Sequence, residues 1–118
     1  MPFMILSVGR DPVLLKTRTS ALADLGYTVE SAASINAAIE RILKGNFDLI
    51  LLCNSLREEE RLRLISVCRR QAPSTPVLIV SENGKSISAV GDQVIPALQH
   101  QIAVAVAEVL PWVHSSVM

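Results

Sequence analysis

The stretch that most constrains the fold of this chain is residues 47–53, where six of the seven side chains are apolar. A strand with so few polar positions has to be covered on both faces, which is typical of the centre of a parallel sheet. Apolar runs at residues 4–8, 27–33 and 77–80 accompany it, and apolar residues recur between them with a period near 3.6. Because right-handed crossovers place helices on both faces of such a sheet, this alternation predicts a doubly wound α/β fold.

The first two expected helices have recognisable ends. Asp11, which precedes a proline, suits the N-cap of the first helix better than the role of a metal ligand, and Gly26 suits its end. Ser34 and Gly45 bound the second helix in the same way. The periodicity places Arg18 outside the apolar face of the first helix, and that face is expected to contain Leu14, Leu15, Ala21, Leu22 and Leu25.

The second half of the chain begins regularly and then becomes less clear. Residues 57–70 predict a helix with glutamates in its first turn and arginines in its last turn, as the helix dipole favours. Residues 85–90 are too few for a full helix, and 93–95 form a minimal strand. Residues 97–110 predict a final helix, and 112–118 are expected to form a loose tail to a single domain spanning the whole chain.

Composition and charge argue against several classes of function. The 118 residues carry 11 Lys or Arg and 11 Asp or Glu, so neither nucleic acid nor a membrane surface is an expected partner. No apolar stretch approaches the roughly 20 residues of a membrane span. Cys53 and Cys68 are not a close metal-type pair, and His100 and His114 have no ligands at metal spacing. We therefore expect a reduced, cytoplasmic protein without a metal or another cofactor.

Four segments resemble the receiver domains of two-component signalling, and the resemblance extends over residues 4–110. The similar segments are residues 5–12, 25–29, 47–52 and 75–81. The resemblance implies the flavodoxin-like, CheY-like receiver fold, a doubly wound sheet of five parallel strands. Only 14 positions separate Ser81 from Ile95 (95 − 81), so we expect a shortened fourth helix.

The same resemblance implies where the phosphorylation site of a receiver would lie. In the family, an acidic pair after strand one binds a divalent metal, an aspartate after strand three accepts the phosphoryl group, and a Ser or Thr and a lysine end strands four and five. This sequence keeps only the serine, so the resemblance implies a degenerate pseudo-receiver that is not an enzyme and acts through a signalling kinase or regulator. The residues of this degenerate cleft are Gly9, Arg10, Asp11, Cys53, Ser81 and Ile95.

Two of these residues leave alternatives open. Arg10 could replace the metal charge by pairing with Asp11 or with a glutamate at 58–60, or it could be a solvated loop residue. Cys53 could be an inert, buried thiol or, if it were exposed near Arg10, a stabilised thiolate. The alternative function is accordingly a ligand or redox sensor that uses the former cleft around Cys53 and Arg10.

The final helix is apolar around nearly its whole circumference, whereas a surface helix normally keeps one polar face. This excess predicts an interaction helix that is covered by a protein partner or by a second copy in a homodimer. The alternative is a helix of alanines that is partly exposed. The residues expected to form the contact are Leu98, Ile102, Val104, Val106 and Val109.

Overall fold

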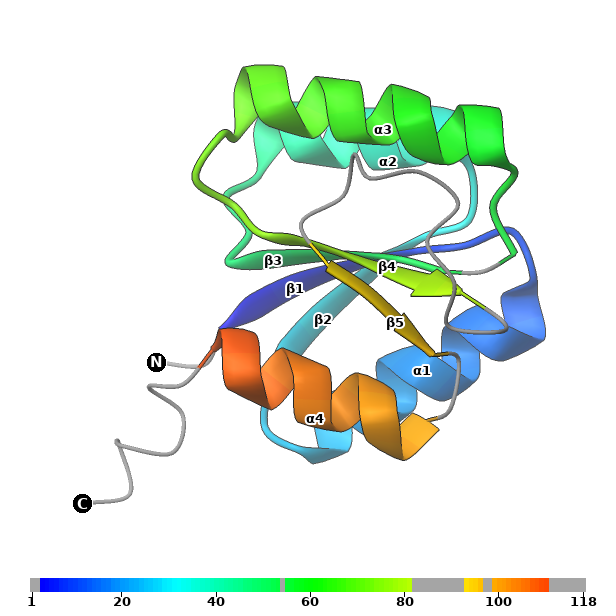
Figure 1. Cartoon of the computed structure of the whole chain (residues 1–118), viewed down its shortest axis with the longest axis vertical. Coiled ribbons are helices and arrows are strands. Elements are labelled where there is room, and N and C mark those ends of the chain that lie inside the picture. Colours follow the sequence, from blue (N-terminus) through cyan, green and yellow to red (C-terminus); the bar gives the residue numbers. More distant parts are fainter. Residues whose placement is uncertain (1–2, 54, 82–92, 97–98, 111–118) are drawn as a thin grey trace.

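The structure, a computed structural model, describes residues 3–53, 55–81, 93–96 and 99–110. Its sheet has the order β2-β1-β3-β4-β5, and all neighbouring strands are parallel (Figure 1). The parallel α/β architecture expected from the sequence is therefore confirmed. The strands are β1 (Met4–Val8), β2 (Thr28–Ala32), β3 (Leu49–Leu52), β4 (Val77–Ser81) and β5 (Gln93–Pro96).

Helices cover both faces of the sheet. Figure 1 shows α2 and α3 side by side on one face and α1 and α4 on the other. The expected shortened fourth helix and the expected loose tail fall on residues 82–92 and 112–118, which lie outside the described residues. The helices are α1 (Pro12–Asp24), α2 (Ile35–Lys44), α3 (Glu58–Gln71) and α4 (Gln99–Val109).

The alternation of side chains along β1 and β3 divides the core into two layers. Leu6 and Ile50 face α2 and α3, whereas Ile5 and Leu51 face α1 and α4. Each of these four side chains is at most 1% exposed. Because the central strands are apolar on both faces, they fix the position of the loops that follow them at the carboxyl edge of the sheet.

The predicted helix starts are confirmed. Asp11 Oδ1 accepts hydrogen bonds from the backbone N–H groups of Val13 at 3.0 Å and Leu14 at 3.3 Å. Ser34 Oγ accepts one from the N–H of Ala37 at 3.1 Å. Each oxygen satisfies helix-terminal donors that would otherwise have no partner within the helix.

Two helices place arginines where the sequence pattern did not predict them. Arg18, expected outside the apolar face, is only 2% exposed, because its position falls between those of Leu15 and Leu22 on the buried stripe of α1. Leu25, expected on that face, follows the end of α1 and is 55% exposed. In α3, Arg61 is buried, and its Nη1 donates to the backbone oxygen of Leu56 at 2.6 Å.

The helix α4 corrects the predicted interaction residues. Ile102 and Val106 are fully buried against the sheet, because residues four apart share one helix face. They cannot also form an outer contact, so this part of the prediction is wrong. Val104 is 52% exposed and Val109 is half-buried, whereas Leu98 lies outside the described residues.

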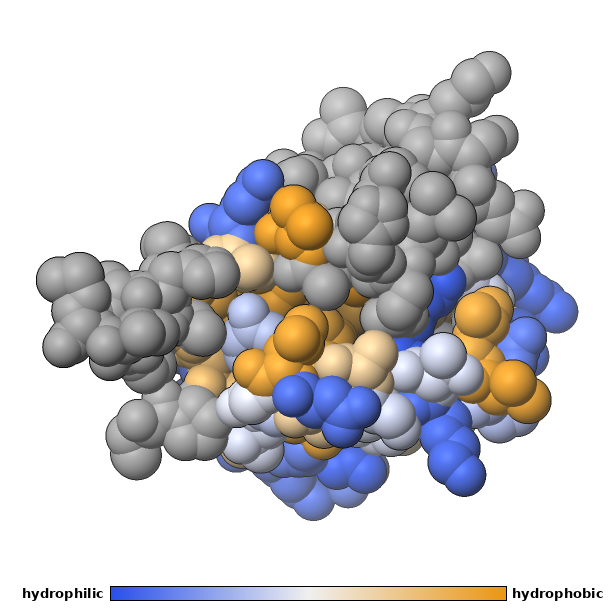
Figure 2. Space-filling model, turned by 90° about the horizontal axis from the view of Figure 1, so that it is seen from below, coloured by the Kyte–Doolittle hydropathy of each residue, from blue (hydrophilic) through white to orange (hydrophobic). Residues whose placement is uncertain are grey.

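The side of the molecule that carries α1 and α4 is shown in Figure 2, where exposed apolar side chains form separate patches among polar ones. Val13 on α1 and Val104 on α4 are the most exposed of the large apolar side chains on these two helices, at 73% and 52%. No helix among the described residues is both long enough and apolar enough to cross a membrane.

Candidate functional site

The residues predicted for the degenerate cleft follow the strands at the carboxyl edge of the sheet, where parallel α/β folds place their sites. Val8 of β1 lies beside Leu52 of β3, so the next residues, Gly9 and Cys53, are neighbours as well. The backbone N–H of Cys53 donates to the oxygen of Val8 at 2.8 Å. The structure therefore brings these two predicted site residues together.

The remaining strand-end residues of the cleft are placed by the register of their backbones. Ser81 ends β4 and pairs with Pro96 of β5, one position beyond the pair formed by Val80 and Ile95. Since β4 is the neighbour of β3, both positions lie along the same edge as Cys53.

Cys53 is a buried thiol. It is 0% exposed, and its Sγ lies 3.8 Å from the Oγ of Ser7, which is equally buried. A reactive cysteine normally combines access from solvent with a nearby positive charge. The burial of Cys53 favours the inert interpretation over the redox interpretation.

The contact between Gly9 and the loop after β3 is too close for a larger side chain. A Cβ atom at Gly9 would lie 3.1 Å from the Cβ of Cys53, 3.1 Å from the Oγ of Ser55 and 3.5 Å from the Sγ of Cys53. An aspartate at position 9 would require these side-chain atoms to shift by a few tenths of an ångström. The side chains of Cys53 and Ser55 thus crowd the space in which a metal-binding carboxylate would begin.

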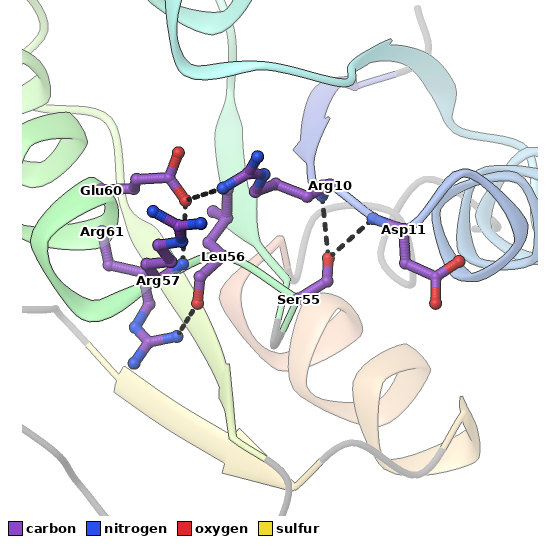
Figure 3. Close-up of polar contacts among 7 residues, drawn as sticks. All are labelled: Arg10, Asp11, Ser55, Leu56, Arg57, Glu60 and Arg61. Atoms are coloured by element: carbon purple, nitrogen blue, oxygen red, sulfur yellow. Dashed lines mark hydrogen bonds and ion pairs between the residues drawn. The ribbon is translucent and has the colours of Figure 1, made fainter.

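Ser55 joins the two loops at this edge, and the sequence reasoning missed it. Its Oγ accepts hydrogen bonds from the backbone N–H groups of Arg10 at 2.9 Å and Asp11 at 3.2 Å (Figure 3). A serine soon after a strand is a weak signal for such a role, because its partners lie 45 and 44 positions away in the sequence. Only the register of β1 and β3 identifies them.

The side chain of Arg10 turns toward the start of α3. Its Nη1 lies 3.6 Å from Oε1 of Glu60, an ion pair that Figure 3 marks, so of the two alternatives left open by the sequence the geometry favours pairing with a glutamate. The same oxygen accepts the backbone N–H of Arg57 at 3.0 Å, which caps the helix. Arg10 therefore places a positive charge at the edge of the cleft, and 45% of its side chain remains exposed.

The carboxylates near the cleft already have contacts within the protein. Within the part of the chain that the structure describes, no three His, Cys, Asp or Glu side chains gather closely enough to hold a metal ion. Asp11 Oδ1 caps α1, and Glu60 Oε1 accepts from the N–H of Arg57 and pairs with Arg10. One oxygen of each carboxylate is therefore engaged in holding the loops and helix starts.

Comparison with known proteins decides the family. The model of the response regulator receiver domain family matches residues 5–99. The chain belongs to this family. It is therefore a receiver domain of the two-component signalling type. No curated protein compared with this chain matches it significantly.

Solved structures agree with this receiver fold. A receiver domain protein from Methanospirillum hungatei JF-1 is 21% identical, with a TM-score of 0.82, and the match covers 98% of this chain and 99% of that one. The chemotaxis protein CheY4 of Vibrio cholerae is 19% identical, with a TM-score of 0.79 and coverage of 92% and 99%. The response regulator TrrA of Thermotoga maritima, in complex with Mg(2+)-BeF, is 18% identical, with a TM-score of 0.80 and coverage of 92% and 99%. At these identities the likeness shows the fold alone.

Proposed function

We propose that this receiver domain is a signalling module that is not phosphorylated at the usual position and acts through protein contacts. The observation that carries the proposal is Cys53, a fully buried thiol at the position after β3 where receivers have their phosphoacceptor aspartate. A carboxylate nucleophile and an attacking geometry open to the phosphodonor are both needed for that reaction. Neither is offered by Cys53.

The surroundings of Cys53 support the same proposal. Receivers hold a divalent metal at the acidic pair after β1, and the metal neutralises the charge of the transferred group. Here Gly9 has no side chain, and Arg10 carries a positive charge, which repels a metal cation. The ion pair of Arg10 with Glu60 and the two hydrogen bonds to Ser55 connect this loop to the segment after β3, which supports an edge that needs no bound phosphoryl group to keep its shape.

The proposed mode of action is constitutive binding of a signalling kinase or regulator, or of a second copy of the chain. The exposed side chain of Val104 on α4 supports a contact on the outer side of that helix. This contact would involve fewer residues of α4 than the sequence suggested, because Ile102 and Val106 belong to the core. Without a phosphorylation site, the binding surface would stay in one state, because phosphorylation could not shift a structural element between two arrangements.

An NMR titration with Mg²⁺ and beryllofluoride, the pair bound by the Thermotoga protein, tests this proposal without covalent chemistry. We expect no saturable change in the amide signals of Gly9, Arg10 and Cys53 when both reagents are added. Mg²⁺ alone and fluoride alone are the controls for general ionic effects. Saturable shifts at these amides that require both reagents would show that the cleft still binds a phosphoryl-like group.

A further inference from the structure

The most unusual charge in the molecule lies away from the cleft, in the middle of α1. Arg18 is 2% exposed and belongs to the largest fully buried side chains. Its Nη1 has no hydrogen-bond partner among the described residues, and Arg18 takes part in none of the ion pairs found there. Loss of a proton cannot remove the cost of burying this charge, because a guanidinium stays protonated in proteins.

Arg18 lies on the buried stripe of α1, between Leu15 and Leu22. Leu22, one turn farther along α1, belongs to the apolar core layer between the sheet and α4. The acidic residue within α1 itself is Asp24, which is the last residue of the helix and is exposed. On α4, the acidic Glu108 is exposed near the end of the helix.

A second unsatisfied donor stands next to Arg18. The Oγ1 of Thr19 is buried and also has no hydrogen-bond partner among the described residues. By contrast, Thr17 in the same helix donates to the backbone oxygen of Val13 at 2.9 Å, as helical threonines commonly do. Two residues that are adjacent in the sequence of α1 thus each present a buried donor without an acceptor among the described residues.

We propose that Arg18 and Thr19 form a binding site for an oxyanion, a phosphate or carboxylate group, at the buried side of α1. A planar guanidinium donates in parallel to two oxygens of such a group, and a hydroxyl can add a third hydrogen bond. The charge of Arg18 would then be compensated, which removes the large penalty of burying a lone cation.

This site is separate from the phosphorylation chemistry at the end of β3. Its ligand is held by hydrogen bonds and charge, so no bond forms or breaks. The source of the oxyanion is either a free ion such as phosphate or a carboxylate group, and the two sources can be distinguished with inorganic phosphate and acetate as probes. Failure of this site would leave the proposed loss of phosphorylation unaffected.

Thermal unfolding of the full chain at constant ionic strength tests the proposal, with chloride replaced stepwise by phosphate or by acetate. We expect a saturable rise in Tm of the wild type with at least one of these anions. A larger rise in Tm with phosphate would indicate that the site takes a free oxyanion. A larger rise with acetate would indicate that it takes a carboxylate group. Arg18→Met should be more stable than the wild type in chloride and should lose the saturable rise.

Two matched variants make the test specific. Arg63→Met removes an exposed arginine from α3, on the other face of the sheet, and should keep the full anion response. Thr19→Val should weaken the response, whereas Thr17→Val should retain it. An equal response in the wild type and Arg18→Met, or no response of the wild type to either anion, would overturn the proposal.

Titration calorimetry provides a readout that does not depend on the stability of the methionine variant. If Arg18→Met fails to fold, we expect Arg18→Lys to bind the effective anion with an affinity reduced about tenfold, because lysine lacks the planar fork. Equal affinities of the wild type and Arg18→Lys would contradict the assignment. A wild type more stable than Arg18→Met in chloride would contradict it too, because the arginine would then already have its partner within the chain.

Discussion

At the scale of single residues, the cleft is closed by small, specific contacts. Gly9 packs its backbone against Cys53, and Ser55 uses one oxygen to hold two successive N–H groups of the neighbouring loop. We therefore expect a side chain added at Gly9 to be crowded by the side chains of Cys53 and Ser55.

The role of Ser55 leads to a stability prediction. Ser55→Ala removes the acceptor of two backbone N–H groups, and a hydrogen bond contributes about 1 kcal/mol to stability. We expect the free energy of unfolding to fall by about 1–2 kcal/mol in urea denaturation. Ser74→Ala, at an exposed position between α3 and β4, is the control and should change it by less than about 0.5 kcal/mol. Equal effects of the two substitutions would contradict the role given to Ser55.

The single tyrosine of the chain gives a pH-dependent prediction. Tyr27 is buried, and desolvation raises the pKa of its phenol above the ordinary value of 10.0. The unfolded chain therefore loses this proton first, so stability should fall as the pH rises above 10.0 and should be unaffected by this group below it. Phenolate absorbance should show a higher midpoint for the folded protein than for the protein in urea. Coincident midpoints would refute the expectation.

At the scale of elements, one carboxylate at the start of α3, that of Glu60, makes two separate contacts. Glu60 caps the helix through the N–H of Arg57 and pairs with Arg10 at the edge of the cleft. The sequence predicted the helix, because glutamates in its first turn and arginines in its last turn are local signals, and it offered the pairing of Arg10 as one of two alternatives. It did not predict Ser55 or the burial of Arg18, since those depend on contacts between elements far apart in the sequence.

The two contacts of Glu60 should differ in strength. Glu60→Ala should cost about 1 kcal/mol through the lost cap, whereas Arg10→Met should cost only about 0.2–1 kcal/mol, because an exposed ion pair is weak. Added salt should reduce the effect of Arg10→Met, because it screens the pair. Glu59→Ala serves as the control in the same helical turn. A larger and salt-independent cost of Arg10→Met, measured by urea unfolding, would show that Arg10 has a stronger role than pairing.

At the scale of the whole molecule, the parallel sheet, the central place of residues 47–53 in it and the helices on both faces could be predicted from the alternation of apolar patterns. The outer surface of α4 could not, because its sequence is apolar on several sides and only the position of the sheet decides which side is buried. The structure assigns Ile102 to the core and Val104 to the surface. This division determines how self-association should be tested.

We expect the wild type to self-associate through the outer side of α4 at high concentration. Val104→Glu should reduce the mass measured by light scattering while the circular dichroism spectrum stays native, because its side chain is already 52% exposed. Ile102→Ala, as the contrasting variant, should lower stability by about 2–5 kcal/mol because it opens a cavity. A wild type that stays monomeric at high concentration would exclude the homodimer, and an unchanged mass in Val104→Glu would exclude this side chain from the contact.

The most direct test of the central claim is the intact mass of the chain after incubation with acetyl phosphate and Mg²⁺ at neutral pH. The account predicts an unchanged mass, because Cys53 is buried and the positions of the acidic pair are held by Gly9 and Arg10. Incubation without Mg²⁺ is the control for nonspecific adducts. A stoichiometric phosphoryl adduct that forms only with Mg²⁺ would contradict the claim that this receiver domain is not phosphorylated.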